Sequence, residues 1–165
     1  MKRVLTSLLL IVTLIISASA QNKKAERDSL ALVKFEKALA AINDKDYVIV
    51  AETYGSEYLP ISDNSVFLSY EKEFIFLQGQ VVAGNEHTNK LTISEFVQTT
   101  DNKGNVKSTM QVRGNLITAK IEISLRKGGG KADVIITPTR GDSRKFTGEV
   151  VPRLESKYFK RTGGI

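Results

Sequence analysis

From residue 106 to residue 136, polar and apolar side chains alternate along the chain, and two glycine-containing turns divide the alternation. Alternation is the pattern of β-strands with one buried face, because successive side chains point to opposite sides of a sheet. The dipeptides Gly114-Asn115 and Gly128-Gly129 are typical of hairpin turns. The segment therefore predicts two consecutive antiparallel hairpins that share their middle strand.

The two predicted turns can be tested against each other, because each one fixes a register for the shared strand. The predicted pairs are Val112–Ile117, Met110–Ala119 and Val106–Ile123 across the first turn, and Leu125–Ala132, Ile123–Val134 and Ile121–Ile136 across the second. Both turns bury the same face of the shared strand, and Ser108 is the one polar residue on that face. A slip by one residue would bury Asp133 or Lys107, so the register is well specified.

The rest of the chain continues this pattern on both sides. The last residues, 154–161, are expected to fold back and pack Tyr158 and Phe159 on the domain. A helix is predicted within residues 26–44 from an apolar stripe. The apolar stripe comprises Leu32, Phe35, Leu39 and Ile42. Further strands are predicted at residues 47–54, 65–70, 73–80, 90–100 and 145–151, with turns at Glu71-Lys72 and at residues 101–104. The predicted fold is α+β and mainly β: an amphipathic N-terminal helix packed on a curled antiparallel meander of about seven to eight strands, sandwich or barrel-like.

The first 20 residues have the pattern of a signal peptide. Lys2 and Arg3 precede an apolar run from Val4 to Ile16, and Ala18-Ser19-Ala20 matches a small-residue cleavage site before Gln21. The apolar run is shorter than the roughly 20 residues that a spanning helix needs. We therefore expect residues 1–20 to be removed, residues 21–165 to form a single domain with no integral membrane segment, and the protein to be periplasmic or secreted.

Charge and cysteine content exclude several classes of protein. Removing Lys2 and Arg3 leaves 22 basic and 18 acidic side chains, a net charge of +4, with no concentrated basic block. Export and the lack of an aromatic-basic motif argue against a nucleic-acid partner. The chain has no cysteine, so disulfides, thiolate metal sites and a lipid anchor on an N-terminal cysteine are all excluded.

The sequence offers no set of catalytic residues and no cofactor or metal motif. The stretch Leu125 to Val134, LRKGGGKADV, lacks the glycine spacing and the following helix of a phosphate-binding loop, so it reads as a hairpin turn. The residues Arg140 to Ser143 spell RGDS, which contains the tripeptide familiar from integrin ligands. The same residues are typical of a hairpin loop, and that is the interpretation we favour. Carboxylates are scattered over predicted strands and turns at Glu52, Glu57, Glu71, Glu73, Glu122 and Glu149.

Three residues remain as candidate ligand contacts. Tyr54 and Tyr58 stand in a stretch with glycine and proline after the first predicted strand, where they would line the mouth of a barrel or sandwich. His87, the only histidine, lies in the polar loop AGNEHTNK without an orienting carboxylate or a nucleophile at a defined spacing. Loop packing of the tyrosines and simple solvation of the histidine are the structural alternatives.

Four stretches resemble a family of small exported proteins of Gram-negative bacteria, domain of unknown function 4251. They are FTGEVVPRLESKYFKR (146–161), AINDKDYVIVAETYG (41–55), NSVFLSYEKEFIFLQG (64–79) and GNLITAKIEISLRKGGGKADVIITPT (114–139). The resemblance spans residues 25–161 and implies export and a helix-plus-sheet domain, without catalytic residues. Family members often carry a glycine-rich loop in mid-chain, whereas the equivalent VVAGNEHTN holds only Gly84.

Three hypotheses about function follow. The leading one is a non-enzymatic exported module that binds a small ligand or an envelope protein. The second is a hydrolase of envelope or glycan material, whose carboxylates the fold would bring together. The third is a structural or inhibitory protein that pairs with a partner through an exposed sheet edge.

Overall fold

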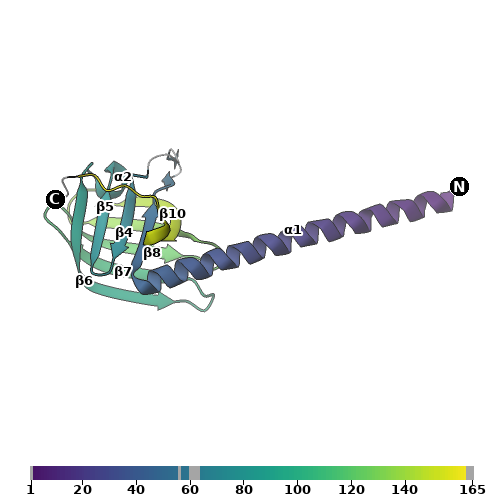
Figure 1. Ribbon diagram of the computed structural model, residues 1–165, viewed down its shortest axis with the longest axis horizontal. Coiled ribbons are helices and arrows are strands. Elements are labelled where there is room, and N and C mark those ends of the chain that lie inside the picture. The colour runs from purple at the N-terminus through teal and green to yellow at the C-terminus, as the bar shows by residue number, and fades with distance from the viewer. Residues whose placement is uncertain (1, 56, 60–63, 163–165) are drawn as a thin grey trace.

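The structure, a computed structural model, describes residues 2–55, 57–59 and 64–162, with side chains from Lys23 onward. It consists of a long N-terminal helix and an antiparallel β-sheet that closes into a barrel (Figure 1). The helices are α1 (Lys2–Asp44), α2 (Gln80–Ala83) and a 3-10 turn at Arg153–Glu155; the strands are β1 (Asp46–Val50), β2 (Thr53–Tyr54), β3 (Glu57–Tyr58), β4 (Phe67–Glu71), β5 (Phe74–Gln78), β6 (Thr88–Thr100), β7 (Val106–Arg113), β8 (Thr118–Leu125), β9 (Lys131–Pro138) and β10 (Arg144–Pro152).

Eight strands form the closed ring, in the order β1-β4-β5-β6-β7-β8-β9-β10, and β10 pairs back onto β1. The predicted fold class is therefore confirmed, and the sheet is a barrel rather than a sandwich. The short hairpin β2–β3 is attached outside the ring, where β2 pairs with β10. Although the order of the ring closes on itself, some described stretches of strand have a partner on one side only, among them β3, and β6 beyond Thr92, where its pairing with β5 ends while its pairing with β7 continues.

The register of the second predicted hairpin is confirmed. Leu125 lies opposite Ala132, and Ile123 lies opposite Val134. The register of the first hairpin is displaced by two residues from the prediction, because Met110 lies opposite Ile121 instead of Ala119.

The cause of this displacement is a longer turn. Arg113 pairs with Thr118, and the Gly114 N–H donates to the Ile117 carbonyl at 2.7 Å, so Ile117 belongs to the turn instead of the strand. A Cβ at Gly114 would lie 2.5 Å from Leu91 Cδ2 and 2.7 Å from the Lys90 carbonyl oxygen, so this position has no room for a side chain. A shift of two residues preserves the facing of every side chain, and the predicted buried face is correct.

Three local predictions are wrong. The β4–β5 turn consists of Lys72 and Glu73 instead of Glu71 and Lys72, and Lys72 takes the left-handed backbone conformation that this turn requires (φ 61°). The predicted strand 73–80 ends at Gln78, because the chain turns at Gly79 into the unpredicted helix α2. The predicted strand 47–54 is split into β1 and β2.

The split in that strand marks the seam where the barrel closes. The Ala51 N–H donates to the Val66 carbonyl before β4, whereas the Glu52 N–H donates to the Thr147 carbonyl of β10, so the chain changes partner between them. Strands β1 and β10 approach each other closely at Gly148, where an added Cβ would overlap the carbonyl oxygen of Val50. This seam needs glycine for space instead of for backbone freedom.

Inward-pointing side chains of the ring fill the barrel interior. Ile75, Leu77, Leu91, Met110 and Ile121 are among those with no exposed surface. A barrel of eight strands is just narrow enough for side chains to fill its interior, and here they do. The polar residue predicted on this face, Ser108, is buried and lies 3.3 Å from the Gln98 side-chain oxygen, to which it donates.

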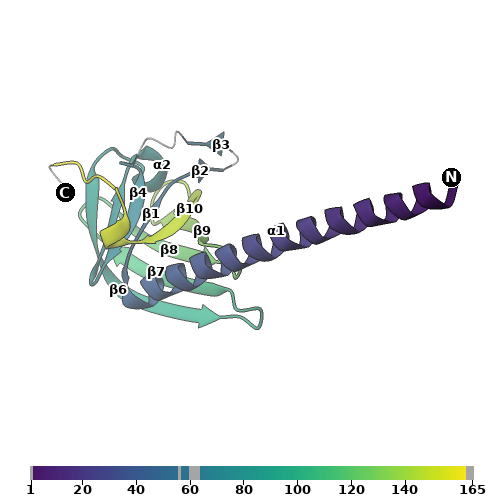
Figure 2. The ribbon, with the colours of Figure 1, turned by 45° about the vertical axis from the view of Figure 1, so that its right-hand side comes forward.

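The C-terminal turns of α1 lie against the barrel beside β1 and β10, and the rest of the helix projects away from it (Figures 1 and 2). Phe35 and Ile42 of the predicted stripe are buried, and Leu39 is partly buried. Leu32 is 46% exposed, so the prediction fails there, because the helix has already passed the edge of the barrel. Where side chains are described, no helix is long and apolar enough to span a membrane.

The C-terminal segment, residues 156–162, crosses the outer face of the ring and is called the strap below. Tyr158 packs edge-on against Phe67 with ring centroids 4.9 Å apart, and its hydroxyl donates to Glu71 at 3.0 Å. The predicted packing of Tyr158 is confirmed, whereas Phe159 is 62% exposed and that part of the prediction is wrong. Phe159 is nevertheless held through its backbone, since the Gln78 side chain donates to its carbonyl at 2.8 Å.

Candidate functional site

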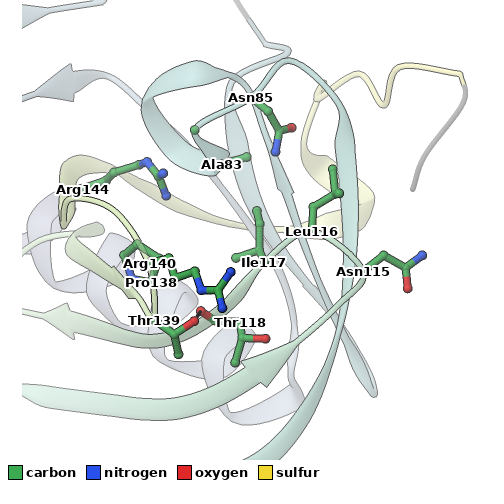
Figure 3. A pocket seen from close by; sticks show the side chains of 11 residues that line it. Ala83, Asn85, Asn115, Leu116, Ile117, Thr118, Pro138, Thr139, Arg140 and Arg144 are labelled. Carbon is green, nitrogen blue, oxygen red and sulfur yellow. Dashed lines mark hydrogen bonds between the residues drawn. The ribbon is translucent and has the colours of Figure 1, made fainter.

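Because side chains fill the barrel, a ligand has to bind outside the core, and the loops around α2 leave a pocket of about 430 Å³. Its lining comes from four segments that are distant in sequence: the end of α2, the β7–β8 turn, the β9–β10 loop and the start of β10 (Figure 3). The lining residues are Ala83, Gly84, Asn85, Asn115, Leu116, Ile117, Thr118, Pro138, Thr139, Arg140 and Arg144.

Helix α2 forms one wall of this pocket because its apolar side faces the core. Val82 and Ala83 are buried, and the helix ends at Gly84, whose left-handed conformation (φ 75°) allows its N–H to reach the Gln80 carbonyl. This conformation favours glycine. The chain then passes through Asn85, which faces the pocket, and continues to β6.

Arg144 points into the end of the barrel. It lies opposite the buried Ile136 and two residues before the buried Phe146, so its side chain starts on the inward face of β10. Its guanidinium lies against Gly84, where an added Cβ would be 2.9 Å from Nε. The Nη1 atom is buried and has no hydrogen-bond partner among the described residues.

Arg140 supplies a second guanidinium from the β9–β10 loop, which lies beside Thr118 and Thr139 (Figure 3). Thr139 is fixed at the end of β9, because its N–H donates to the Thr118 carbonyl at 2.9 Å. No acidic side chain lines the pocket, and within the described part of the chain neither arginine forms an ion pair. The pocket is therefore electropositive and rich in hydrogen-bond donors.

The loop after α2 is fastened to the C-terminal strap. Arg161 forms an ion pair with Glu86 and donates from Nη1 to the Glu86 carbonyl at 2.6 Å. The buried Asn89 side chain donates to Asn85 Oδ1 at 2.9 Å. These contacts hold Asn85 in place at the pocket wall.

The structure separates the three predicted ligand contacts. Tyr54 lies opposite Phe146 and Tyr58 lies opposite Thr53, so the two tyrosines start on opposite faces of the β2–β3 hairpin. Tyr58 is 86% exposed and borders a groove outside the barrel. His87 is exposed beside the pocket loop, where its backbone N–H donates to Asn85 Oδ1 at 2.9 Å. Ligand binding by these residues stays a prediction.

The groove beside Tyr58 runs over the β1–β10 seam and has a volume of about 780 Å³. Val50, Ala51, Leu59 and Val151 give it an apolar floor. Glu52 and Glu149, which are 97 positions apart, both line this groove, and the backbone N–H of Glu149 donates to Glu52 Oε1 at 3.2 Å. The fold thus brings one pair of the scattered carboxylates together.

Each carboxylate of this pair is matched by a lysine. Lys131 forms an ion pair with Glu52, and Lys34 of α1 lies 2.9 Å from Glu149. The hydrogen bond from Lys131 to Glu52 raises the pKa of Lys131, against a smaller opposing effect of burial. The rim is therefore close to neutral in charge.

Two of the other carboxylates, Glu122 and Glu71, take part in local ion pairs. Glu122 pairs with Lys107 at 2.7 Å on the outer face of the barrel. Burial alone would raise the pKa of Glu71, but hydrogen bonds from Lys160, Ser69 and Tyr158 outweigh it and lower this pKa. Among the residues described, no group of histidine and acidic side chains could hold a metal ion.

Sequence reasoning missed Arg144, although the signal was available. The last strand was predicted to start at Lys145, and extending its alternation by one residue places Arg144 inward with Phe146. An inward-facing charge is unusual, because charged side chains are rarely buried unless they are paired. Arg140 gave no such signal, because it follows the strand.

The comparisons bear on the fold. A scan against protein-family models and a search of curated proteins found no match. Among solved structures, the chain is similar to the crystal structure of a DUF4251 family protein from Bacteroides eggerthii DSM 20697, with a TM-score of 0.66 and 20% identity over 78% of this chain and 94% of that chain. That structure bears the name of the family that the sequence resembles, which confirms the resemblance. At this level of identity, the likeness establishes a shared fold.

Proposed function

We propose that the protein is an exported binding module that takes a small ligand into the pocket at the α2 end of the barrel. One observation carries the proposal: the barrel interior is filled, whereas four segments at this end leave an open pocket lined by donors. Ligand sites are usually concave and carry a few convergent polar groups. A rigid barrel that carries the site in its end loops is a common arrangement of binding proteins.

Export is supported by the signal-peptide pattern of residues 1–20. We expect the protein to be found outside the cytoplasm with Gln21 as its first residue. Expression with its own leader, followed by fractionation and N-terminal sequencing, tests this. An uncleaved chain retained in the cytoplasm would contradict it.

Binding is tested by an NMR titration of the purified protein with a library of small charged and neutral compounds. We expect the amide signals of Gly84, Asn85 and Thr118 to shift with at least one compound class. The amides of Gly128 and Lys131, at the far end of β8 and β9, are the internal control. Shifts confined to other surfaces, or none with any class, would refute the pocket as the binding site.

The alternative function is hydrolysis, and the meeting of Glu52 and Glu149 at one groove is the observation in its favour. Acid–base hydrolysis needs one carboxyl group to stay protonated. Each of the two carboxylates is instead engaged in an ion pair, Glu52 with Lys131 and Glu149 with Lys34. If hydrolysis of a glycan or peptide substrate were detected, and Glu149→Gln abolished it while Glu57→Gln did not, the enzymatic alternative would replace the binding proposal.

A further inference from the structure

The ligand class follows from Arg144. Its side chain enters the barrel end from the inward face of β10, and its buried Nη1 has no partner among the described residues. A guanidinium carries five N–H donors and always bears its charge. Burying part of that charge without a partner is unfavourable, so such an arrangement persists where it serves a purpose beyond stability.

Three arginines elsewhere in the chain are paired with carboxylates and show the contrast. Arg126 pairs with Asp133 at 2.7 Å, Arg153 pairs with Asp46 at 2.5 Å, and Arg161 pairs with Glu86. Arg140 and Arg144 have no such partner within the described residues, and both line the same pocket. Two unneutralised guanidinium groups therefore converge on a space that contains no carboxylate of the protein.

The remaining lining completes the description of a ligand. Thr118, Thr139 and Asn85 add polar groups around the arginines, and Leu116 and Pro138 add a small apolar border. The pocket volume of about 430 Å³ is that of a small-molecule site, which ordinarily spans about 300–1,000 Å³. A compact molecule with one anionic group and a modest apolar part matches these features.

We infer that the ligand is a small organic oxyanion, a carboxylate or a phosphate monoester, whose anionic group pairs with the guanidinium of Arg144 while Arg140 closes over it from the rim. Arginine suits both groups because its planar fork donates two parallel hydrogen bonds to a carboxylate or a phosphate. This inference rests on the proposed function, since it names the ligand class of the same pocket.

The experiment compares matched probes by NMR titration and calorimetry. Benzoate and phenyl phosphate are the anionic probes, inorganic phosphate tests whether the anion alone suffices, and benzamide is the neutral analogue of benzoate. We expect the anionic probes to shift the Gly84 and Thr118 amides and the Arg144 Nε–H signal, and benzamide to shift none of them. Whichever of benzoate and phenyl phosphate binds more tightly indicates whether the ligand is a carboxylate or a phosphate.

Three variants locate the interaction. Arg144→Gln should weaken anion binding by about tenfold or more, which is the value of one charge-assisted hydrogen bond. Thr118→Glu, at an exposed position of the rim, should abolish binding by placing a competing carboxylate beside Arg140. Arg126→Gln, on a surface turn outside the pocket, is the matched control and should bind as the unaltered protein does.

The outcomes separate the inference from the proposed function. If benzamide binds in the pocket as well as benzoate does, or if Arg144→Gln leaves anion affinity unchanged, the inference is wrong while a ligand pocket remains. If no probe shifts the pocket amides, both fail. Should Arg144→Gln not fold, the comparison of benzoate with benzamide on the unaltered protein and the Thr118→Glu variant still decide.

Discussion

Removing the hydroxyl group of Tyr47 is expected to make the protein more stable. Tyr47 lies on the inward face of β1 with 1% of its surface exposed, and its ring packs edge-on against Tyr70 with centroids 5.7 Å apart. Its hydroxyl oxygen is buried and has no hydrogen-bond partner among the described residues. Burial, and to a lesser extent Tyr70, raises its pKa well above the usual range, so the hydroxyl is neutral at pH 7.

The magnitude follows from the cost of an unsatisfied polar group. A buried hydroxyl without a partner costs about 1–3 kcal/mol, because it has lost its hydrogen bonds to water. Tyr47→Phe removes that cost and leaves a void of one oxygen atom, which offsets part of the gain. We expect the free energy of unfolding to rise by about 1 kcal/mol and the melting temperature by about 3–5 °C for a chain of this size.

The assay is urea denaturation with calorimetry, and Tyr158→Phe is the matched control. The same chemical change at Tyr158 removes the hydrogen bond to Glu71, so that variant should lose about 1 kcal/mol. Opposite signs for the two variants would support the reasoning. A loss of stability in Tyr47→Phe would refute it, because the hydroxyl would then have a partner in solution, such as an internal water.

Two further predictions concern the seam and the strap. Gly148→Ala should lower the free energy of unfolding by about 3 kcal/mol or more, because the new methyl group would overlap the Val50 carbonyl oxygen and force β1 away from β10. Urea denaturation measures this loss. A loss below about 1 kcal/mol would contradict the prediction and show that the two strands can shift apart at the seam. Glu71→Gln should lower the free energy of unfolding by about 1 kcal/mol at pH 7. The loss is small because the ion pair between Glu71 and Lys160 is partly exposed to solvent. Because the folded-state pKa of Glu71 lies below its unfolded value, its contribution is present above that unfolded value and is lost as the pH falls through the folded-state pKa. The difference from the unaltered protein should therefore narrow in melting curves taken below pH about 4, and a difference independent of pH would contradict this account.

The elements that the sequence predicts well are those with local causes. The turn at Gly128-Gly129 and the alternation on both sides of it determine the β8–β9 register within about 20 residues, and the observed pairs match. The β7–β8 register fails for an equally local reason. Ile117 is apolar and fits the alternation of a strand, but its carbonyl accepts the hydrogen bond that closes the turn.

Barrel closure and the pocket depend on contacts between distant residues. Closure pairs Ile49 with Val150, and no local pattern in either segment specifies that partner. The pocket brings Ala83 and Asn85 next to Arg144 only because the ring has closed. Helix α2 was missed because a helix of four residues is too short for an apolar period to be recognised.

Buried polar groups show where a fold such as this one serves a purpose beyond stability. Ser108 and Asn89 are buried and hydrogen-bonded, so packing and hydrogen bonding account for both. Two buried atoms in the described chain lack a partner, Tyr47 Oη and Arg144 Nη1. Tyr47 lies in the filled interior, where no ligand can reach its hydroxyl, so we interpret that atom as a cost to stability. Arg144 lies at a pocket open to solvent, so a ligand can supply the missing hydrogen-bond partner from outside. A buried polar atom without a partner therefore leads to different predictions at the two positions: mutation of Tyr47 should raise stability, and mutation of Arg144 should weaken ligand binding.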